Sequence, residues 1–220
     1  RTANWKDDVN KMNEALLKEN ITAAVHEIYS PRRVNGMADK LGIMSGMSLD
    51  LTVNDDDGEP WDFNVKEKRD KAERLIREKK ALLLIGSPMC TAFSKLQNIN
   101  FSRMTREDVE KVKEHGTRHL EFCMHLYKIQ DEQGMYFLHE HPEDASSWNN
   151  IKVNEMLNRK KVERVTGHMC AFGMLQEDHL GKALIKKPTS FMSNSSEILK
   201  RLSKKCEGAH RHILLVGGRA

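Results

Sequence analysis

The chain has 220 residues, 39% of them hydrophobic and 31% charged, with a net charge of +4 and an isoelectric point near 8.8. This length predicts one domain with a sizeable core, and the composition excludes a disordered chain. No apolar run approaches the length of a membrane span and no signal-peptide core is present, so we expect a soluble protein without a membrane partner. The mildly basic balance is compatible with nucleic-acid binding but does not require it.

The cysteines are few and widely spaced, and no Cys-x-x-Cys pair occurs. The four are Cys90, Cys123, Cys170 and Cys206. Such spacing favours reduced thiols in an intracellular, reducing compartment, which would be the nucleus in a eukaryote. Because the chain begins with Arg1 and not with methionine, we expect a piece of a longer polypeptide or a processed product.

The first part of the chain alternates between helical and strand patterns. The predicted elements are a helix over 4–20 within an N-terminal segment 1–22, a strand over 23–29, a helix over 32–41, a strand over 47–51, a turn over 54–58, a helix from an Asn64 N-cap to residue 78, and a strand over 81–85. The acidic turn lacks the later glutamate of a calcium loop, so we predict no ion there. The strand over 81–85 is a continuous apolar run, typical of a central strand that is buried on both faces.

The second part continues the alternation. The predicted elements are a loop to residue 103, a long helix from a Thr105 cap to Gly134, a strand over 135–138 that leads into His139, Glu140 and His141, a helix over 153–157, a strand over 164–172, a polar loop over 175–190, a helix over 197–202 and a last strand over 212–216. Strands alternating with helices predict an α/β sandwich with a mostly parallel sheet and helices on both faces. We therefore expect one domain over 23–220, preceded by the N-terminal helix.

Two chemically capable side chains follow predicted strands. Cys90 lies just past the strand over 81–85, and Glu140 follows the strand over 135–138. If these strands are neighbours, the thiolate could attack an electrophilic carbon while the carboxyl group protonates a ring nitrogen, a pairing that suits addition to a pyrimidine. The alternative is that Cys90 is a small apolar filler, since free cysteines are often buried.

Acidic residues at earlier strand ends could hold a nucleotide-like cofactor. Glu27, Asp50 and Asp62 are positioned to contact ribose hydroxyls, an amino group and adenine. Trp61 and Phe63 could stack on adenine, and burial in the core is an equally good interpretation.

Several motifs together resemble the cytosine-C5 methyltransferases. Gly86-Ser-Pro-Met-Cys-Thr-Ala-Phe-Ser94 is similar to the family's catalytic loop, and Phe137-Leu-His-Glu-His-Pro142 stands where the family has Glu-Asn-Val. The segments from Cys170 to Gly173 and from Lys187 to Asn194 resemble a late part of phage-type members. The order of motifs over about residues 24–216 is most similar to methyltransferase-like segments in retroelement polyproteins.

The resemblance implies a Rossmann-like methyltransferase fold and methyl transfer from S-adenosylmethionine to C5 of cytosine in DNA. It implies that Cys90 is the nucleophile, that Glu140 contacts cytosine N3 and that Lys187 replaces a target-contacting arginine. It also implies a set of cofactor-binding residues: Glu27, Tyr29, Ser30, Asp50, Leu51, Asp62, Phe63, Ser87 and Pro88. A cytosine in duplex DNA would have to be flipped out of the stack.

The sequence also departs from the family pattern. No glycine follows the first strand between Tyr29 and Val34, Met89 replaces a proline, and His141 replaces the asparagine after Glu140. The interval after Gly173 is too short for a separate target-recognition domain, so loops, other parts of a polyprotein or a partner would select the target. An RNA cytosine methyltransferase and an inactive nucleic-acid-binding module of a retroelement polyprotein remain alternatives. A cysteine hydrolase is disfavoured because no histidine-plus-carboxamide arrangement is evident.

Histidines and cysteines in the second half raise the question of a metal site. The candidates are His139, His141, His168, Cys170, Cys206, His210 and His212. Their spacing matches no standard zinc finger, and histidines at strand ends are more often structural, so we predict no metal ligand. The basic residues Arg32, Arg33, Lys204, Lys205 and Arg211 could meet phosphates, although such runs are usually solvated surface.

Overall fold

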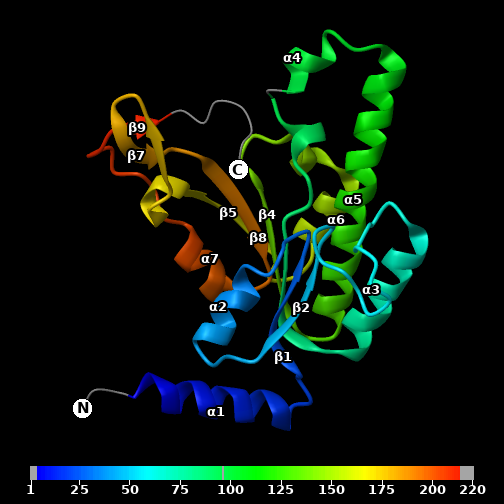
Figure 1. Ribbon diagram of the computed structural model, residues 1–220, viewed down its shortest axis with the longest axis vertical. Helices are drawn as coiled ribbons and strands as arrows, with labels where there is room; N and C mark the ends of the chain where they lie inside the picture. The colour runs from blue at the N-terminus through cyan, green and yellow to red at the C-terminus, as the bar shows by residue number, and fades with distance from the viewer. Residues whose placement is uncertain (1–3, 96, 214–220) are drawn as a thin grey trace.

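A computed structural model describes residues 4–95 and 97–213 (Figure 1). Its centre is a six-stranded sheet with strand order β2-β1-β3-β4-β8-β5. The strands are β1 (Ala23–Ile28), β2 (Ser45–Leu49), β3 (Ala81–Gly86), β4 (Tyr136–Pro142), β5 (Glu163–His168) and β8 (Pro188–Ser193). β8 runs antiparallel between β4 and β5, and the other strands are parallel to one another. The mostly parallel sheet that the sequence predicts is confirmed.

Helices flank this sheet on both faces. Figure 1 shows α3, α5 and α6 on one side of the sheet and α1, α2 and α7 on the other. The helices are α1 (Trp5–Lys18), α2 (Val34–Lys40), α3 (Lys66–Glu78), α4 (Gln97–Phe101), α5 (Arg106–Glu132), α6 (Ile151–Leu157) and α7 (Ser196–Leu202), with 3₁₀ turns η1 (Thr91–Phe93), η2 (Ser146–Asn149) and η3 (Met169–Phe172). Among the described residues, no helix combines the length and the apolar character needed to cross a bilayer.

The main core lies between the sheet and the helices α3, α5 and α6. It contains Leu84 of β3 and Phe137 of β4, packed against Leu120 and Tyr127 of α5. The helices cover the opposite face of the sheet less completely, and Leu83 of β3 is therefore partly exposed there. The central strand is therefore less completely buried than its apolar sequence predicts.

A second, smaller sheet takes two of its strands from the segment of chain between β5 and β8 and its third from the end of the described chain. It has the order β6-β7-β9 and consists of β6 (Leu175–Asp178), β7 (Gly181–Ile185) and β9 (His212–Ile213). The prediction of a polar loop over 175–190 is therefore wrong. The sequence of β6 resembles a loop because almost all of the strand is exposed and needs no apolar residues. The sequence of β8 is polar because the strand buries hydroxyl side chains such as Ser190 and Ser193. These hydroxyls are hydrogen-bonded within the sheet, so a polar sequence there is compatible with a buried strand.

Several element boundaries also differ from the prediction. The residue before α3 is Val65, which has no capping side chain, so the predicted Asn64 cap is wrong. The Asn64 Oδ1 atom that would accept a backbone N–H of the helix lies 3.1 Å from His119 Nε2 instead. β4 continues to Pro142, so its histidines and Glu140 lie within the strand, and β5 already ends at His168. A short helix, α4, occupies part of the predicted loop before residue 103.

The start of the long helix α5 and the last strand agree with the sequence prediction where they are described. The Thr105 cap of α5 is confirmed, since its hydroxyl oxygen accepts the Asp108 backbone N–H at 3.1 Å. The predicted last strand is present at His212 and Ile213, paired in the small sheet with β7, and its residues 214–216 lie outside the described residues, as do residues 1–3 of the N-terminal segment.

Candidate functional site

The order of the strands defines where a ligand would bind. From β1 the chain moves outward to β2 and then returns to β3 on the other side of β1. In open α/β sheets such a reversal leaves a crevice at the carboxyl ends of the strands, and ligands bind there. A cavity of about 230 Å³ opens at this place, lined by Tyr29, Asp50, Leu51, Trp61, Asp62, Phe63, Asn64, Ser87, Met89 and His119. We call it the switch-point cavity.

Most of the residues predicted to bind a cofactor meet at the switch-point cavity. Six of them, Tyr29, Asp50, Leu51, Asp62, Phe63 and Ser87, are lining residues. Three others, Glu27, Ser30 and Pro88, are not among the lining residues. The acidic, aromatic and loop residues of the first three strand ends are therefore brought together from distant parts of the sequence.

The two carboxylates at the cavity are only partly engaged by the protein. Asp50 follows β2, and its Oδ1 accepts hydrogen bonds from the backbone N–H and the hydroxyl of Thr52 at 3.0 and 2.6 Å. Oδ1 of Asp62 accepts from the backbone and side-chain nitrogens of Asn64 at 2.9 Å. Among the described residues neither Oδ2 atom has a hydrogen-bond partner, so each can accept from a ligand hydroxyl or amino group.

Glu27 is held in a different way. It is completely buried in β1, and its carboxylate accepts five hydrogen bonds, two from the hydroxyls of Ser30 and Ser48 and three from backbone N–H groups of residues 33–35. These N–H groups belong to the first turn of α2, where an anion is favourable. Glu27 therefore anchors α2 to the sheet, and Ser30 supports it.

Tyr29 has a left-handed backbone, with φ of +57°, directly after β1. This conformation suits glycine and is rare for other residues, so the turn adopts a glycine-like geometry without a glycine. Tyr29 is fixed by ring contact with Phe63 at 5.0 Å and by a hydrogen bond to His119 Nδ1 at 2.9 Å. Phe63 and Trp61 are themselves buried in the core, so they form the floor of the cavity.

His119 is a cavity residue that the sequence analysis missed. Burial lowers its pKa to about 4, with His115 as a second cause, so the ring is neutral at pH 7. Its Nε2 lies 3.1 Å from Asn64 Oδ1, which can only accept a hydrogen bond. Nδ1 must then accept from the Tyr29 hydroxyl, and burial raises the pKa of that hydroxyl well above its usual value. The spacing of His115 and His119, on one face of a helix, was the available signal.

Cys90 lies in the loop after β3, at the start of η1, and it is half-buried. Burial raises the pKa of its thiol above the usual range of a cysteine; the positive charge of Lys187 acts against this shift and the negative charge of Glu140 adds to it. The charges of Lys187 and Glu140, the other two predicted catalytic residues, therefore act on the Cys90 thiol. The filler interpretation does not describe this thiol, because it is neither fully buried nor remote from charged groups.

Glu140 and Lys187 face each other beside Cys90. Lys187 Nζ lies 3.8 Å from Glu140 Oε1, and each side chain is about one-third exposed, 32% and 27% respectively. Glu140 comes from β4, which pairs with β3 in parallel, and Lys187 directly precedes β8, which pairs with β4. The sheet thus brings together three residues from different parts of the chain.

His141 fixes the position of the Cys90 loop. Its Nε2 donates to the Pro88 carbonyl oxygen at 2.9 Å, and its Nδ1 accepts from the Ser147 hydroxyl at 2.6 Å. Burial lowers the pKa of His141 to about 4, so the neutral tautomer needed for both bonds is present at pH 7. His141 therefore connects β4 to Pro88, which lies two residues before Cys90.

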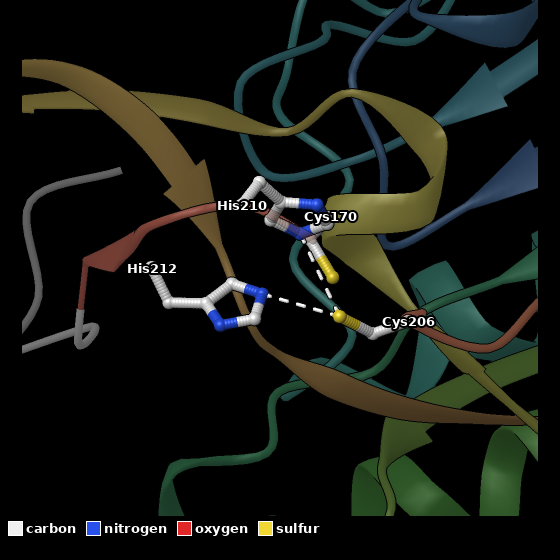
Figure 2. Close-up of side chains that lie close together, drawn as sticks. All are labelled: Cys170, Cys206, His210 and His212. Carbon is white, nitrogen blue, oxygen red and sulfur yellow. Dashed lines mark hydrogen bonds between the residues drawn. The ribbon is translucent and has the colours of Figure 1, made fainter. Parts of the chain in front are cut away.

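A second group of chemically capable side chains lies near the small sheet. Figure 2 shows Cys170, Cys206, His210 and His212 turned toward one another, and their possible ligand atoms all lie within 4.8 Å of one another. They come from η3, from the segment after α7 and from β9. The sequence analysis predicted no metal ligands, because this set spans three elements and has no standard spacing.

A further cavity of about 250 Å³ lies between α5 and α6. It is lined by long charged and methionine side chains, including Glu121, Lys128 and Arg159. None of its lining residues belongs to the carboxyl ends of the strands or to the Cys90 loop. The switch-point cavity and the adjoining group Cys90, Glu140 and Lys187 form the candidate site.

No protein-family model matches the chain, and no curated protein matches it.

Proposed function

We propose that this protein transfers a methyl group from S-adenosylmethionine to C5 of cytosine in DNA, through a covalent adduct with Cys90. The observation that carries the proposal is the common environment of the Cys90 thiol, the Glu140 carboxylate and the Lys187 ammonium beside the switch-point cavity. A nucleophile and a group that can hydrogen-bond a ring nitrogen are the two functions that addition to cytosine requires. The Rossmann-like methyltransferase class is part of the same proposal.

The switch-point cavity has groups that suit the cofactor. The open Oδ2 of Asp50, at the end of β2, is placed to accept from ribose hydroxyls. The open Oδ2 of Asp62, beside the aromatic floor formed by Phe63, is placed to accept from an adenine amino group. S-adenosylmethionine would supply an electrophilic methyl group there. Ser87 and Met89 of the Cys90 loop line the cavity, so the thiol would hold the acceptor base beside it.

The residues of this chain would act in sequence on the cytosine. The Cys90 thiolate would form a bond to C6, and the Glu140 carboxyl group, once it has taken up a proton, would donate to N3, so that the C5–C6 π electrons move to C5. C5 then takes the methyl group as the bond between that methyl and the sulfonium sulfur breaks, which leaves S-adenosylhomocysteine. Loss of the C5 proton to a base and departure of the sulfur restore the ring. Because burial keeps the Cys90 pKa above its usual value, Lys187 has to stabilise the thiolate as the base enters.

Trapping with fluorinated DNA tests this proposal. With duplex DNA that contains 5-fluorocytosine, and with S-adenosylmethionine, wild-type protein should form an adduct that survives denaturation, because fluorine at C5 blocks the elimination step. Cys90→Ser should form none. Glu140→Gln should form it at least about 100-fold more slowly and bind the cofactor with nearly unchanged affinity.

The outcomes distinguish the classes of function. An adduct with single-stranded RNA and none with DNA would assign the activity to RNA. Binding of nucleic acid without any adduct would contradict the enzymatic proposal and favour an inactive binding module. An adduct that persists in Cys90→Ser would show that another residue is the nucleophile.

A further inference from the structure

The four side chains Cys170, Cys206, His210 and His212 have the composition of a closed metal site. Figure 2 shows the four side chains turned toward one another, with dashed lines from the Cys206 sulfur to both imidazoles. Cys206 Sγ lies 3.6 Å from His210 Nε2 and 3.3 Å from His212 Nε2. With the bond lengths of a tetrahedral zinc ion, a sulfur and a nitrogen ligand are about 3.6 Å apart. The first of these distances equals that value and the second is close to it, and the other pairs of possible ligand atoms lie within 4.8 Å of each other.

The surroundings of Cys206 hold its sulfur in this position. The Gly208 N–H donates to Cys206 Sγ at 3.3 Å, and Gly208 has a left-handed φ of +81°, which the turn requires. The Cys206 N–H donates to Nδ1 of His168, at the end of β5, at 3.0 Å. A backbone hydrogen bond to the sulfur and an outer partner that fixes the ligand loop are both typical of metal sites.

The described part of the small sheet buries few apolar side chains. Among residues 4–95 and 97–213, β6 is almost wholly exposed, and the buried apolar side chains of the sheet are Ala183, Ile185 and Ile213. Leu175 and Leu180 are exposed by 60% and 68%. Small elements with so little buried apolar surface usually depend on a disulfide or a metal. The four side chains join β9 to η3 and to the segment after α7, which is where such a connection is needed.

We propose that Cys170, Cys206, His210 and His212 bind one zinc ion, which fastens the small sheet to the central domain. Two thiolates and two imidazoles favour zinc over magnesium or calcium, which prefer oxygen ligands. Four protein ligands leave no open position, so the ion is structural. The site also supports Lys187, because the Met169 N–H, next to Cys170, donates to the Lys187 carbonyl oxygen at 3.1 Å. The proposal does not depend on methyl transfer.

Metal analysis tests the site directly. The whole chain, purified under reducing conditions without chelator and dialysed against metal-free buffer, should contain about one zinc ion per molecule by mass spectrometry. Cys206→Ser should lower this content at least about tenfold, since a closed site loses one of four ligands. His179→Ala is the matched control, because His179 is an exposed histidine in the turn that joins β6 to β7 of the same small sheet. It should keep the full zinc content.

A second measurement applies if Cys206→Ser does not fold. Replacing zinc by cobalt in the wild-type protein should give the strong visible absorption of a tetrahedral site and a thiolate-to-cobalt band in the near ultraviolet. Chelation of the metal should lower the melting temperature, and zinc should restore it. Less than about a tenth of an equivalent of zinc, a disulfide between Cys170 and Cys206, an octahedral cobalt spectrum, or equal zinc loss in His179→Ala would each overturn the proposal.

Discussion

Glu27 and Asp50 are both carboxylates near the carboxyl end of a parallel strand, but they are held differently. Glu27 is completely buried and accepts five hydrogen bonds, whereas Asp50 is half-buried and has one oxygen without a described partner. The first side chain therefore stabilises the fold, and the second is open to a ligand. From their positions in the sequence, both carboxylates were predicted to bind the cofactor.

Substituting each carboxylate by its amide separates these two roles. Glu27→Gln places an NH₂ group against N–H and O–H donors and should lower the free energy of unfolding by about 2 kcal/mol or more. Asp50→Asn should change that free energy by less than about 0.5 kcal/mol and weaken binding of S-adenosylmethionine at least about tenfold. Urea unfolding and calorimetric titration measure the two effects. Equal destabilisation by both variants would contradict this division.

At the scale of elements, the packing of β3 against α5 depends on one glycine. A Cβ atom at Gly86 would lie 2.2 Å from Tyr127 Oη and 2.7 Å from Cys123 Sγ, both in fully buried side chains of α5. Gly86 also precedes the Cys90 loop, so the approach of α5 and the position of the thiol are linked. The absence of a side chain there is a packing requirement.

Alanine at two glycines tests this requirement. Gly86→Ala should lower the free energy of unfolding by about 1–3 kcal/mol, because β3 or α5 must move to make room. Gly36→Ala is the matched control, since no atom lies within 4 Å of a Cβ at this position in α2. It should stabilise the protein by about 0.5–1 kcal/mol through helix propensity. Urea midpoints that shift in the same direction for both variants would show that the contact with α5 is not limiting.

At the scale of the whole molecule, buried neutral histidines make the fold sensitive to acid. Among the described residues His26, His119, His139 and His141 are buried, and burial is the main cause that lowers the pKa of each. The unfolded chain takes up protons at these groups near pH 6.5, and the folded protein does so only at lower pH. Stability from these groups is complete above pH 6.5 and is lost as the pH falls toward 4.

Unfolding at several pH values measures this effect. Between pH 6.5 and 4 the free energy of unfolding should fall by about 1 kcal/mol or more per pH unit, because the unfolded state binds more protons. His26→Gln should make the dependence less steep, since His26 is neutral in the fold, where its Nε2 donates to the Lys79 carbonyl oxygen. His179→Gln, at an exposed position, should leave the slope unchanged. A stability that does not depend on pH in this range would contradict the burial of neutral rings.

The sequence by itself determined the features that depend on local patterns. Apolar periodicity predicted the alternating strands and helices, the Thr105 cap marked the start of α5, and the apolar run before Gly86 placed Cys90 at the end of a central strand. Asp50 and Asp62 were predicted to share a binding site because carboxyl ends of parallel strands meet at one edge of the sheet, and the resemblance to the methyltransferases implied Tyr29, Leu51, Phe63 and Ser87, which line the same cavity. These signals are contained in short stretches of chain.

Only the tertiary structure decided the features that depend on distant partners. The burial of Glu27 results from the approach of α2, the strand β8 is inserted between two strands that precede it in the chain, and the small sheet pairs β7 with β9. The convergence of Cys170 with His212 follows from that pairing and has no local spacing. The physical reason is that a residue's hydrogen-bond partners, burial and pKa depend on neighbours brought by folding, which no short stretch of sequence specifies.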